Sequence, residues 1–301
     1  MPGPKKAEAV TIYSREVLDR FDEYVHGAIS RRGFIEKIAA HAGSVAAATT
    51  LLAALSPDFA RAQVIAPTDA RITVSKIEIP SPEGSGSINA YVAKPAGASR
   101  GKRKPVVLVV HENRGLNPHI EDIARRLAVD GFIAVAPDAL SKLGGYPGDE
   151  DKARALFGTL DQTKIRPDFI AAALYAEALP DGNGELGAVG FCYGGGIVNK
   201  LATQVPTLRA GVPFYGQPPP LEEVPAIKAE LLVNLAGNDT RINGSWPAYE
   251  DALKKAGVRY QGFIYAGVEH GFNNDTTPRF NKEAAALAWG RTIALFKRCL
   301  G

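Results

Sequence analysis

The chain has 301 residues, of which 46% are hydrophobic, so it can bury a large core and is not expected to be disordered. Its 35 basic and 32 acidic side chains give a formal net charge of +3, and no basic stripe interleaved with aromatic residues is present, which argues against a nucleic-acid partner. Two cysteines are too few for a disulfide framework, and no clustered His and Cys spacing indicates zinc, so we expect no metal.

Residues 1–62 have the order of features found in an export leader. Arg31 and Arg32 precede an alanine-rich apolar run, and small residues at 60–62, Ala-Arg-Ala, flank a bond that a signal peptidase could cleave. The paired arginines resemble those of Tat signals, and the apolar run is too short and too interrupted to span a bilayer. We therefore expect this leader to direct export to the periplasm or the outside, leaving residues 63–301 as the mature domain.

A second interpretation of the leader stays open. Residues 16–29 form an amphipathic pattern that is long for the charged region of an export signal. In this alternative the first 62 residues are a helical arm that is retained on the domain, and the protein stays in the cytoplasm.

Beyond the leader, short strand-like runs recur along the chain. The first two alternate apolar and polar residues and are separated by PSPEGSGS, which is typical of a hairpin. The other runs are continuously apolar, as strands buried inside a parallel sheet are. The expected strands are 72–79, 88–94, 106–110, 132–136, 186–190, 211–214, 231–235 and 260–265.

Segments with helical periodicity lie between these strands, and apolar residues share one face in each of three of them. The alternation of strand and helix predicts an α/β domain whose sheet is mostly parallel, has helices on both faces and carries an antiparallel hairpin at one edge. In such sheets the functional residues lie at the carboxyl ends of the strands. The three helical faces are formed by Ile120, Ile123, Ala124 and Leu127; by Trp246, Tyr249, Leu253 and Ala256; and by Trp289, Ile293, Phe296 and Leu300.

Cys192 follows one of the expected strands, within the pentapeptide Gly190-Phe191-Cys192-Tyr193-Gly194. This is the G-x-S-x-G pattern with sulfur in place of the serine hydroxyl, and its glycines leave room where a strand turns sharply into a helix. The dipole of that helix would favour the thiolate. A buried structural cysteine in a glycine-rich turn is the alternative for the pentapeptide alone.

An acid and a base follow Cys192 in the chain order expected of this architecture. Asp239 lies in the loop after strand 231–235, and His270 lies in the loop after strand 260–265. His111 is the other candidate base, but it precedes the nucleophile, and shaping its loop is the favoured role. A nucleophile that attacks a carbonyl also needs donors for the oxyanion, for which we expect the backbone N–H groups of Tyr193 and Asn113.

Four segments together resemble the dienelactone hydrolase family of α/β-hydrolases: HENRGLNPHIEDIARRLAVDGFIAVAPD, GFCYGGG, GNDTRI and HGFNND. The resemblance covers about residue 70 to the C-terminus. It implies an α/β-hydrolase fold in which Cys192 is the nucleophile, His270 the base and Asp239 its orienting acid. It also makes Glu112 the family glutamate, which contacts the resting thiol and swings away when substrate binds. From the residues alone, Glu112 could equally be a solvated carboxylate at a strand end.

The chain departs from the family at one position. Where the dienelactone enzyme has an arginine for the substrate carboxylate, four residues after the histidine, this chain has Asn274. Lys142, Arg114 and Arg241 are loosely placed substitutes for the missing positive charge. An anionic lactone is therefore a doubtful substrate, and a wider range of small esters or lactones is expected.

The sequence thus predicts a hydrolase of small esters or lactones that needs no cofactor and acts through a Cys-His-Asp triad and an acyl-enzyme. A thioesterase or another α/β-hydrolase activity is the nearest alternative. A protein of another class, a non-catalytic or redox thiol protein that uses Cys192, also stays open, although Cys299 is poorly placed to be a resolving cysteine.

Overall fold

The computed structural model describes residues 13–59, 63–98 and 103–301, and the chain divides into two compact units, Met1–Pro57 and Asp58–Gly301. We call them the helical unit and the C-terminal unit. The expected cleavage site at 60–62 lies outside the described residues.

The helical unit contains α1 (Arg15–Val25), α2 (Arg31–Ala42) and α3 (Val45–Leu55). A serine side chain accepts a hydrogen bond from the first turn of each helix, which satisfies backbone donors that would otherwise lack a partner. These capping residues are Ser14, Ser30 and Ser44. The helices enclose an apolar core of their own, formed by Val17, Leu18, Phe21, Tyr24, Phe34, Ile38, Ala48, Leu52 and Leu55.

The two arginines of the expected export signal are the first two residues of α2, and Arg32 forms an ion pair with Glu36 one turn later. Among the described helices, none has by itself the length and apolar character of a membrane span. The helices α2 and α3 reach that level only as a pair, across a bend of 115°.

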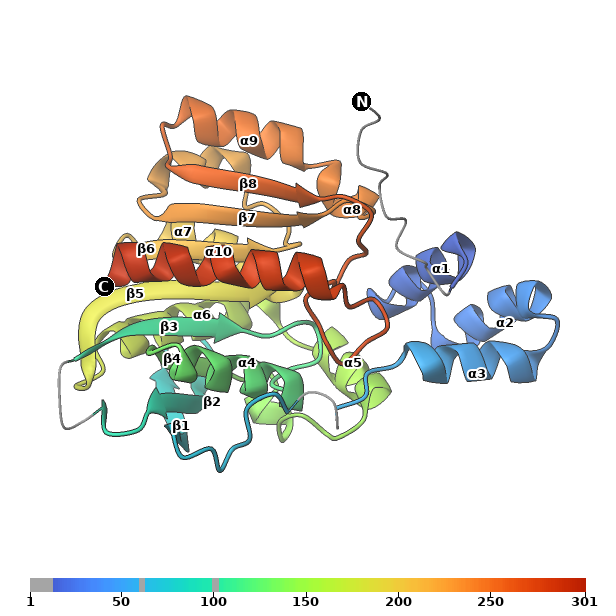
Figure 1. The fold of residues 1–301 in the computed structure, drawn as a ribbon, viewed down its shortest axis with the longest axis horizontal. Coiled ribbons are helices and arrows are strands. Elements are labelled where there is room, and N and C mark those ends of the chain that lie inside the picture. Colours follow the sequence, from blue (N-terminus) through green and yellow to red (C-terminus); the bar gives the residue numbers. More distant parts are fainter. Residues whose placement is uncertain (1–12, 60–62, 99–102) are drawn as a thin grey trace, which may run out of the picture. The chain divides into compact units, whose positions relative to one another are not determined.

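The C-terminal unit is built around a sheet of eight strands in the order β1-β2-β4-β3-β5-β6-β7-β8 (Figure 1). Strands β1 and β2 form an antiparallel hairpin at one edge, and β2 is also antiparallel to β4. All other neighbours are parallel, so the predicted topology is confirmed. The strands are β1 (Ile72–Ser81), β2 (Gly86–Pro95), β3 (Lys104–Val110), β4 (Ile133–Pro137), β5 (Gly182–Phe191), β6 (Leu208–Phe214), β7 (Glu230–Ala236) and β8 (Tyr260–Tyr265).

Helices cover both faces of this sheet (Figure 1). The helices α4 (Pro118–Val129) and α10 (Lys282–Leu300) pack on one face and share one buried apolar cluster with it. The other face carries α6 (Gln162–Glu177), α7 (Tyr193–Gln204) and α9 (Trp246–Lys255), which belong to a second cluster. Shorter elements complete the unit: η2 (Ser141–Leu143), α5 (Glu150–Gly158), η3 (Leu221–Ala226) and α8 (Thr240–Asn243).

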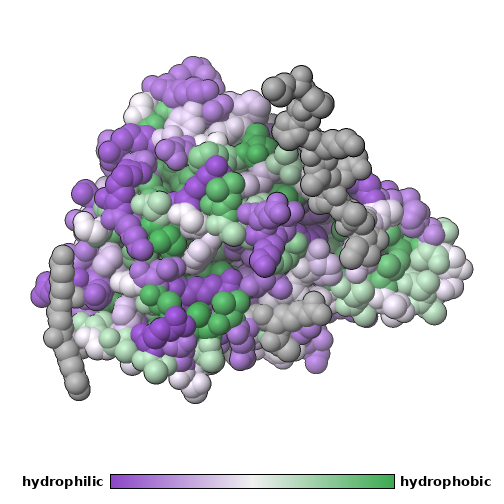
Figure 2. All heavy atoms as spheres, in the orientation of Figure 1, coloured by the Kyte–Doolittle hydropathy of each residue, from purple (hydrophilic) through white to green (hydrophobic). Residues whose placement is uncertain are grey.

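The surface over α4 and α10 mixes hydrophilic and apolar side chains (Figure 2). Ile264 and Leu287 are examples of apolar side chains that remain more than half exposed. Scattered apolar side chains of this kind are ordinary on folded proteins, so they do not define an interface.

The parallel arrangement fixes where chemistry can occur. Because β3, β5, β6, β7 and β8 run in the same direction, the loops that follow them lie at one edge of the sheet. These segments contain Glu112, Cys192, Tyr215, Asp239 and His270.

Candidate active site

Cys192 occupies the turn between β5 and α7 in a strained backbone conformation. Its φ of 56° and ψ of −113° are rare for a residue with a side chain, and strain of this kind concentrates at functional sites. The N–H of Cys192 donates to the carbonyl of Phe214 at 3.0 Å, which ties the turn to the end of β6. The side chain is 9% exposed at the start of α7, where the positive end of the helix dipole favours an anion.

The glycines on either side of Cys192 are required by close backbone contacts. A Cβ on Gly190 would lie 2.2 Å from the carbonyl oxygen of Gly194, and a Cβ on Gly194 would lie 2.2 Å from that of Val110. Strand, turn and helix therefore approach each other too closely for any side chain, which is the reason for the G-x-C-x-G pattern.

Asp239 and His270 meet at the ends of β7 and β8. Nδ1 of His270 lies 2.5 Å from Oδ2 of Asp239, so the ring N–H can donate to the carboxylate. The other carboxylate oxygen accepts from the N–H of Ile242, which fixes the acid at the start of α8. Burial alone would raise the pKa of Asp239, but the hydrogen bond and charge of His270 outweigh it and hold that pKa below its usual value.

The sulfur of Cys192 and a ring nitrogen of His270 lie within 4.8 Å of each other. The structure therefore brings the predicted nucleophile, base and acid into one cluster. Geometries of this kind often tighten when a substrate binds.

Glu112 lies at the end of β3 and is half-buried. Its Oε2 accepts a hydrogen bond of 3.0 Å from the side chain of Asn274, in the loop that carries His270. Asn274 also accepts from the N–H and the hydroxyl of Thr276, so its own amide is occupied in positioning this loop. The residue that replaces the family arginine thus holds Glu112 at the site.

The two predicted oxyanion donors lie on either side of the turn. Tyr193 is the first residue of α7, and its hydroxyl donates to Gln162 at 2.7 Å. Asn113 follows Glu112, and its side-chain oxygen accepts from Arg114 at 2.7 Å. This contact orders the loop that carries the second donor.

Arg114 is not the exposed arginine that its loop position suggests. Its side chain is 7% exposed and forms an ion pair of 3.4 Å with Glu150 on α5. Burial lowers the pKa of Arg114, whereas the carboxylate of Glu150 acts in the opposite direction. Lys142 donates to Ser87 in the β1–β2 hairpin, and Arg241 is exposed on α8.

His111 is fully buried and has both ring nitrogens engaged. Nδ1 lies 2.5 Å from the carbonyl of Glu112, and Nε2 accepts from the N–H of Ala139 at 3.1 Å. Burial lowers the pKa of His111, which keeps the ring neutral. His111 therefore shapes the loop after β3.

Sequence reasoning missed Tyr215, which follows β6 at the same edge of the sheet. Its ring centroid lies 4.7 Å from that of His270, and its φ of 39° is positive. The only available signal was its place directly after an expected strand, which Cys192 and Asp239 share.

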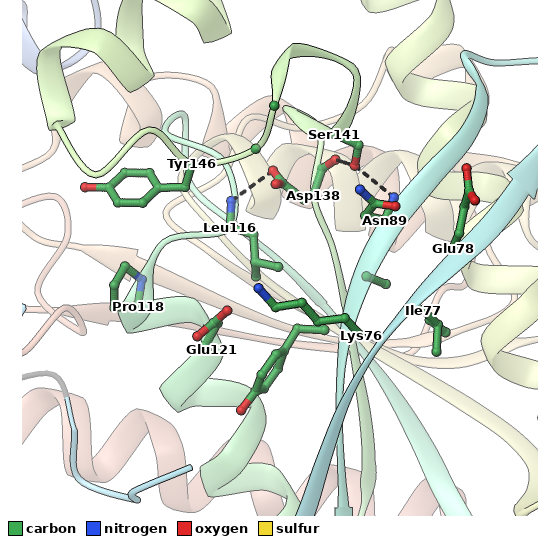
Figure 3. Close-up of a pocket in the computed structure, with 14 residues that line it drawn as sticks. Lys76, Ile77, Glu78, Asn89, Leu116, Pro118, Glu121, Asp138, Ser141 and Tyr146 are labelled. Atoms are coloured by element: carbon green, nitrogen blue, oxygen red, sulfur yellow. Dashed lines mark hydrogen bonds between the residues drawn. The ribbon is translucent and has the colours of Figure 1, made fainter.

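A separate cavity of about 580 Å³ lies between the β1–β2 hairpin, the start of α4 and the loop after β4 (Figure 3). Figure 3 shows Lys76 reaching toward Leu116 and Glu121, with Asp138 accepting from the N–H of Leu116. Cys192, Asp239 and His270 are not among its lining residues, so this cavity is distinct from the cluster described above.

The family model described as the dienelactone hydrolase family matches residues 88–300, and a model described as YqhI-like matches residues 6–43. A Synechocystis protein provisionally named carboxymethylenebutenolidase is 33% identical over 234 residues, which cover 72% of this chain and 94% of that protein. An Escherichia coli protein provisionally named hydrolase fragment YghX is 52% identical over 116 residues, covering 38% of this chain and 97% of the relative.

A solved structure agrees with the sequence matches. The crystal structure of a Klebsiella pneumoniae protein provisionally named dienelactone hydrolase superposes with a TM-score of 0.66 at 27% identity, covering 75% of this chain and 99% of that one. Because the family model spans most of the chain and the fold agrees as well, this protein is a hydrolase that belongs to the dienelactone hydrolase family and has the α/β-hydrolase fold.

Proposed function

We propose that the protein hydrolyses small carboxylic esters and lactones through an acyl-enzyme on Cys192. The observation that carries the proposal is the hydrogen bond of 2.5 Å between His270 and Asp239, with the sulfur of Cys192 within 4.8 Å of the imidazole. A base held by a buried acid beside a nucleophile on a strained turn is the arrangement that acyl transfer requires.

In the proposed reaction, His270 takes the proton from the thiol of Cys192, and the resulting thiolate attacks the carbonyl carbon. The backbone N–H groups of Tyr193 and Asn113 donate to the oxyanion that forms. When the carbon–oxygen bond breaks, the alkoxide leaves with the proton that His270 holds, and a thioester remains. Water then gives a proton to His270 and attacks the thioester, which releases the acid and returns the proton to sulfur.

Asp239 supports each of these proton transfers. Its carboxylate accepts from Nδ1 of His270, which leaves the other ring nitrogen to exchange the proton with the thiol and the alkoxide. It also stabilises the imidazolium that forms in each half of the reaction.

The substrate that fits best is a neutral or weakly polar ester or lactone. Asn274 is engaged with Glu112, and Arg114 is paired with Glu150, so neither side chain stands ready to pair with a carboxylate on the substrate. The provisional name of the Synechocystis relative, carboxymethylenebutenolidase, favours a lactone among these candidates.

A redox role for Cys192 receives no support from the position of the second cysteine. Cys299 lies 3.8 Å from Glu230, the first residue of β7, whereas Cys192 follows the last residue of β5. The two thiols are thus at opposite edges of a parallel sheet and are too far apart to form the disulfide that a redox cycle needs.

The proposal is tested with a panel of short-chain esters, thioesters and five- and six-membered lactones. We expect the full chain and its Cys299→Ser variant to hydrolyse the same members of the panel at similar rates, while Cys192→Ala loses roughly 10⁴-fold or more. Cys192→Ser should keep the fold and lose most activity. Iodoacetamide labelling of the peptide that contains residue 192 should also vanish in Cys192→Ala, and a preference for thioesters over oxygen esters would favour a thioesterase.

A further inference from the structure

Tyr215 adopts a backbone conformation that a bulky residue rarely takes. Its φ of 39° is positive, in the region that favours glycine, yet the N–H of Tyr215 still donates to the carbonyl of Asn234 at 2.7 Å. The preceding residue, Phe214, accepts from the N–H of Cys192. The end of β6 therefore holds both the nucleophile turn and the strained tyrosine, and strain that persists at such a place calls for a functional explanation.

The strained backbone directs the ring of Tyr215 into the site. The ring lies 4.7 Å from the imidazole of His270 and 5.6 Å from the ring of Phe272, measured between centroids. The side chain is 1% exposed, so the aromatic contacts exclude water from around it. A phenylalanine could make the same ring contacts, so packing does not explain the hydroxyl.

The hydroxyl proton of Tyr215 has no acceptor among the residues that the structure describes. Leaving a buried donor without an acceptor destabilises a fold by about 1–3 kcal/mol, and native proteins rarely contain one without a reason. A tyrosine hydroxyl can donate one proton. The hydroxyl of Tyr215 is therefore suited to an anion that forms next to it during the reaction.

Two negative groups act on this hydroxyl. Burial, followed by the charges of Glu112 and Cys192, raises the pKa of Tyr215 well above that of an ordinary tyrosine, while Arg279 and the N–H of Asn273 act in the opposite direction. Burial therefore favours the neutral phenol, which can donate its proton. Glu112 already accepts from Asn274, whereas Cys192 gains its negative charge only when His270 removes the thiol proton.

We propose that Tyr215 is a catalytic residue whose hydroxyl donates a hydrogen bond to the thiolate of Cys192. The inference rests on the proposed role of Cys192 as the nucleophile. No covalent bond changes in this step, because the phenol keeps its proton and the thiol proton resides on His270. The hydrogen bond stabilises the thiolate before attack and is released as the sulfur bonds to the carbonyl carbon.

The test is the pH profile of iodoacetamide alkylation at Cys192, followed by peptide mass spectrometry in the full chain. Tyr215→Phe removes only the hydroxyl, and we expect the midpoint of the profile to move about one unit to higher pH, with roughly tenfold slower alkylation below the midpoint. Tyr249→Phe is the matched control, because Tyr249 is also buried but donates to Asn199 on the far side of the sheet. Its profile should coincide with that of the wild type.

Ester turnover provides a second readout. In Tyr215→Phe we expect kcat to fall at low pH and to recover as the pH rises. At higher pH the thiol of Cys192 ionises even without the hydrogen bond from Tyr215. A purely structural role would instead lower the melting temperature and reduce kcat equally at every pH. An unchanged alkylation midpoint in a folded Tyr215→Phe protein would overturn the proposal, as would a midpoint that moves to lower pH.

Two further measurements keep the outcomes separate. If Tyr215→Phe does not fold, 3-fluorotyrosine at position 215 is a stronger donor and should move the midpoint to lower pH; no movement would overturn the proposal. If Cys192→Ala keeps full turnover, the proposed function fails, whereas the alkylation profiles still report whether Tyr215 stabilises the thiolate.

Discussion

At the scale of single residues, the site depends on side chains that constrain each other across loops. Asn274 holds Glu112, Asp239 holds His270, and Tyr215 lies against the imidazole. Each contact joins two loops that follow different strands. A change at one residue is therefore expected to affect a residue on another loop or the stability of the site, and two variants measure these effects.

The first variant is Glu112→Gln, which removes a negative charge and keeps an oxygen for Asn274. The charges of Glu112 and Cys192 both raise the pKa of Tyr215, so we expect the two side chains to influence each other. We expect the alkylation profile of Cys192 to move to lower pH, ester turnover to fall, and the free energy of unfolding to change by only about 0.5 kcal/mol. Glu121→Gln, in the separate cavity, is the control and should leave the alkylation profile of Cys192 unchanged. If Glu112→Gln gives the same profile as this control, Glu112 is a solvated loop carboxylate without a role at the thiol.

The second variant concerns acid stability. The folded protein holds the pKa of Asp239 below its value in the unfolded chain, so this carboxylate stabilises the fold above about pH 4 and loses that effect as the pH falls further. Asp239→Asn should lower the free energy of unfolding by about 1 kcal/mol at pH 7, and the difference from wild type should shrink below pH 4. Denaturant unfolding at several pH values measures it. For Asp251→Asn, at an exposed position, we expect no such pH dependence. If the difference in the free energy of unfolding between Asp239→Asn and the wild type is the same at every pH, the carboxylate of Asp239 does not stabilise the fold in this way.

Single residues also mark the limit of what the sequence could predict. Cys192, Asp239 and His270 could be placed because each lies in the turn or loop that follows an expected strand, and parallel strands end at one edge. Tyr215 occupies the same kind of position, but in VPFYG it has the pattern of a core aromatic, and a positive φ cannot be read from a residue other than glycine. Arg114 is buried against Glu150, which lies on a different element, and no local sequence pattern predicts such a pair.

At the scale of elements, the turn from β5 into α7 is the part of the fold on which the site depends most. A Cβ on Gly194 would clash with the carbonyl oxygen of Val110, and a Cβ on Gly190 would clash with the carbonyl oxygen of Gly194. The existence of the strands and their mostly parallel arrangement could be predicted from periodicity, whereas their exact bounds could not. The start of β5 at Gly182 was missed because its first residues, GNGE, have no apolar pattern. The helix α5 was not predicted because only Ala153 and Phe157 are buried in it.

The turn can be tested by substituting two glycines that are two residues apart. Gly194→Ala would place a Cβ 2.2 Å from a backbone oxygen, so we expect a loss of at least about 1–3 kcal/mol in the free energy of unfolding and a large loss of turnover. At Gly196 the nearest atom to a new Cβ is 3.7 Å away, so Gly196→Ala should leave stability unchanged or raise it by up to about 1 kcal/mol. Equal effects of the two changes in chemical denaturation would contradict the described turn.

At the scale of the whole molecule, the chain consists of two units with separate apolar cores. The C-terminal unit binds its own first residues: the N–H groups of Val64 and Ile65 donate to Asp122, and Arg125 donates to the carbonyl of Ile65 at 2.5 Å. These contacts fix the segment directly after the expected cleavage site. We propose that the first 62 residues are an export leader and are dispensable for the hydrolase.

Two changes test the leader. A chain that begins at Gln63 should stay in solution, keep its turnover and melt within about 4 °C of the full-length protein, because its contacts from Val64 onward are retained. Arg31→Lys with Arg32→Lys should retain the precursor in the cytoplasm, while Arg15→Lys with Arg20→Lys in α1 should not. Aggregation of the shortened chain would make the first 62 residues part of the hydrolase structure, and unaltered export of the Arg31 and Arg32 variant would exclude the Tat route.

The central claim is that Cys192 carries the acyl group during turnover. It is tested most directly by quenching the full-length protein in acid during hydrolysis of an activated ester and measuring the masses of its peptides. We expect the peptide containing Cys192 to gain the mass of the acyl group and to lose it again on longer incubation, while Cys299 stays unmodified. An unmodified Cys192 peptide throughout turnover, together with undiminished hydrolysis by Cys192→Ala, would contradict the account.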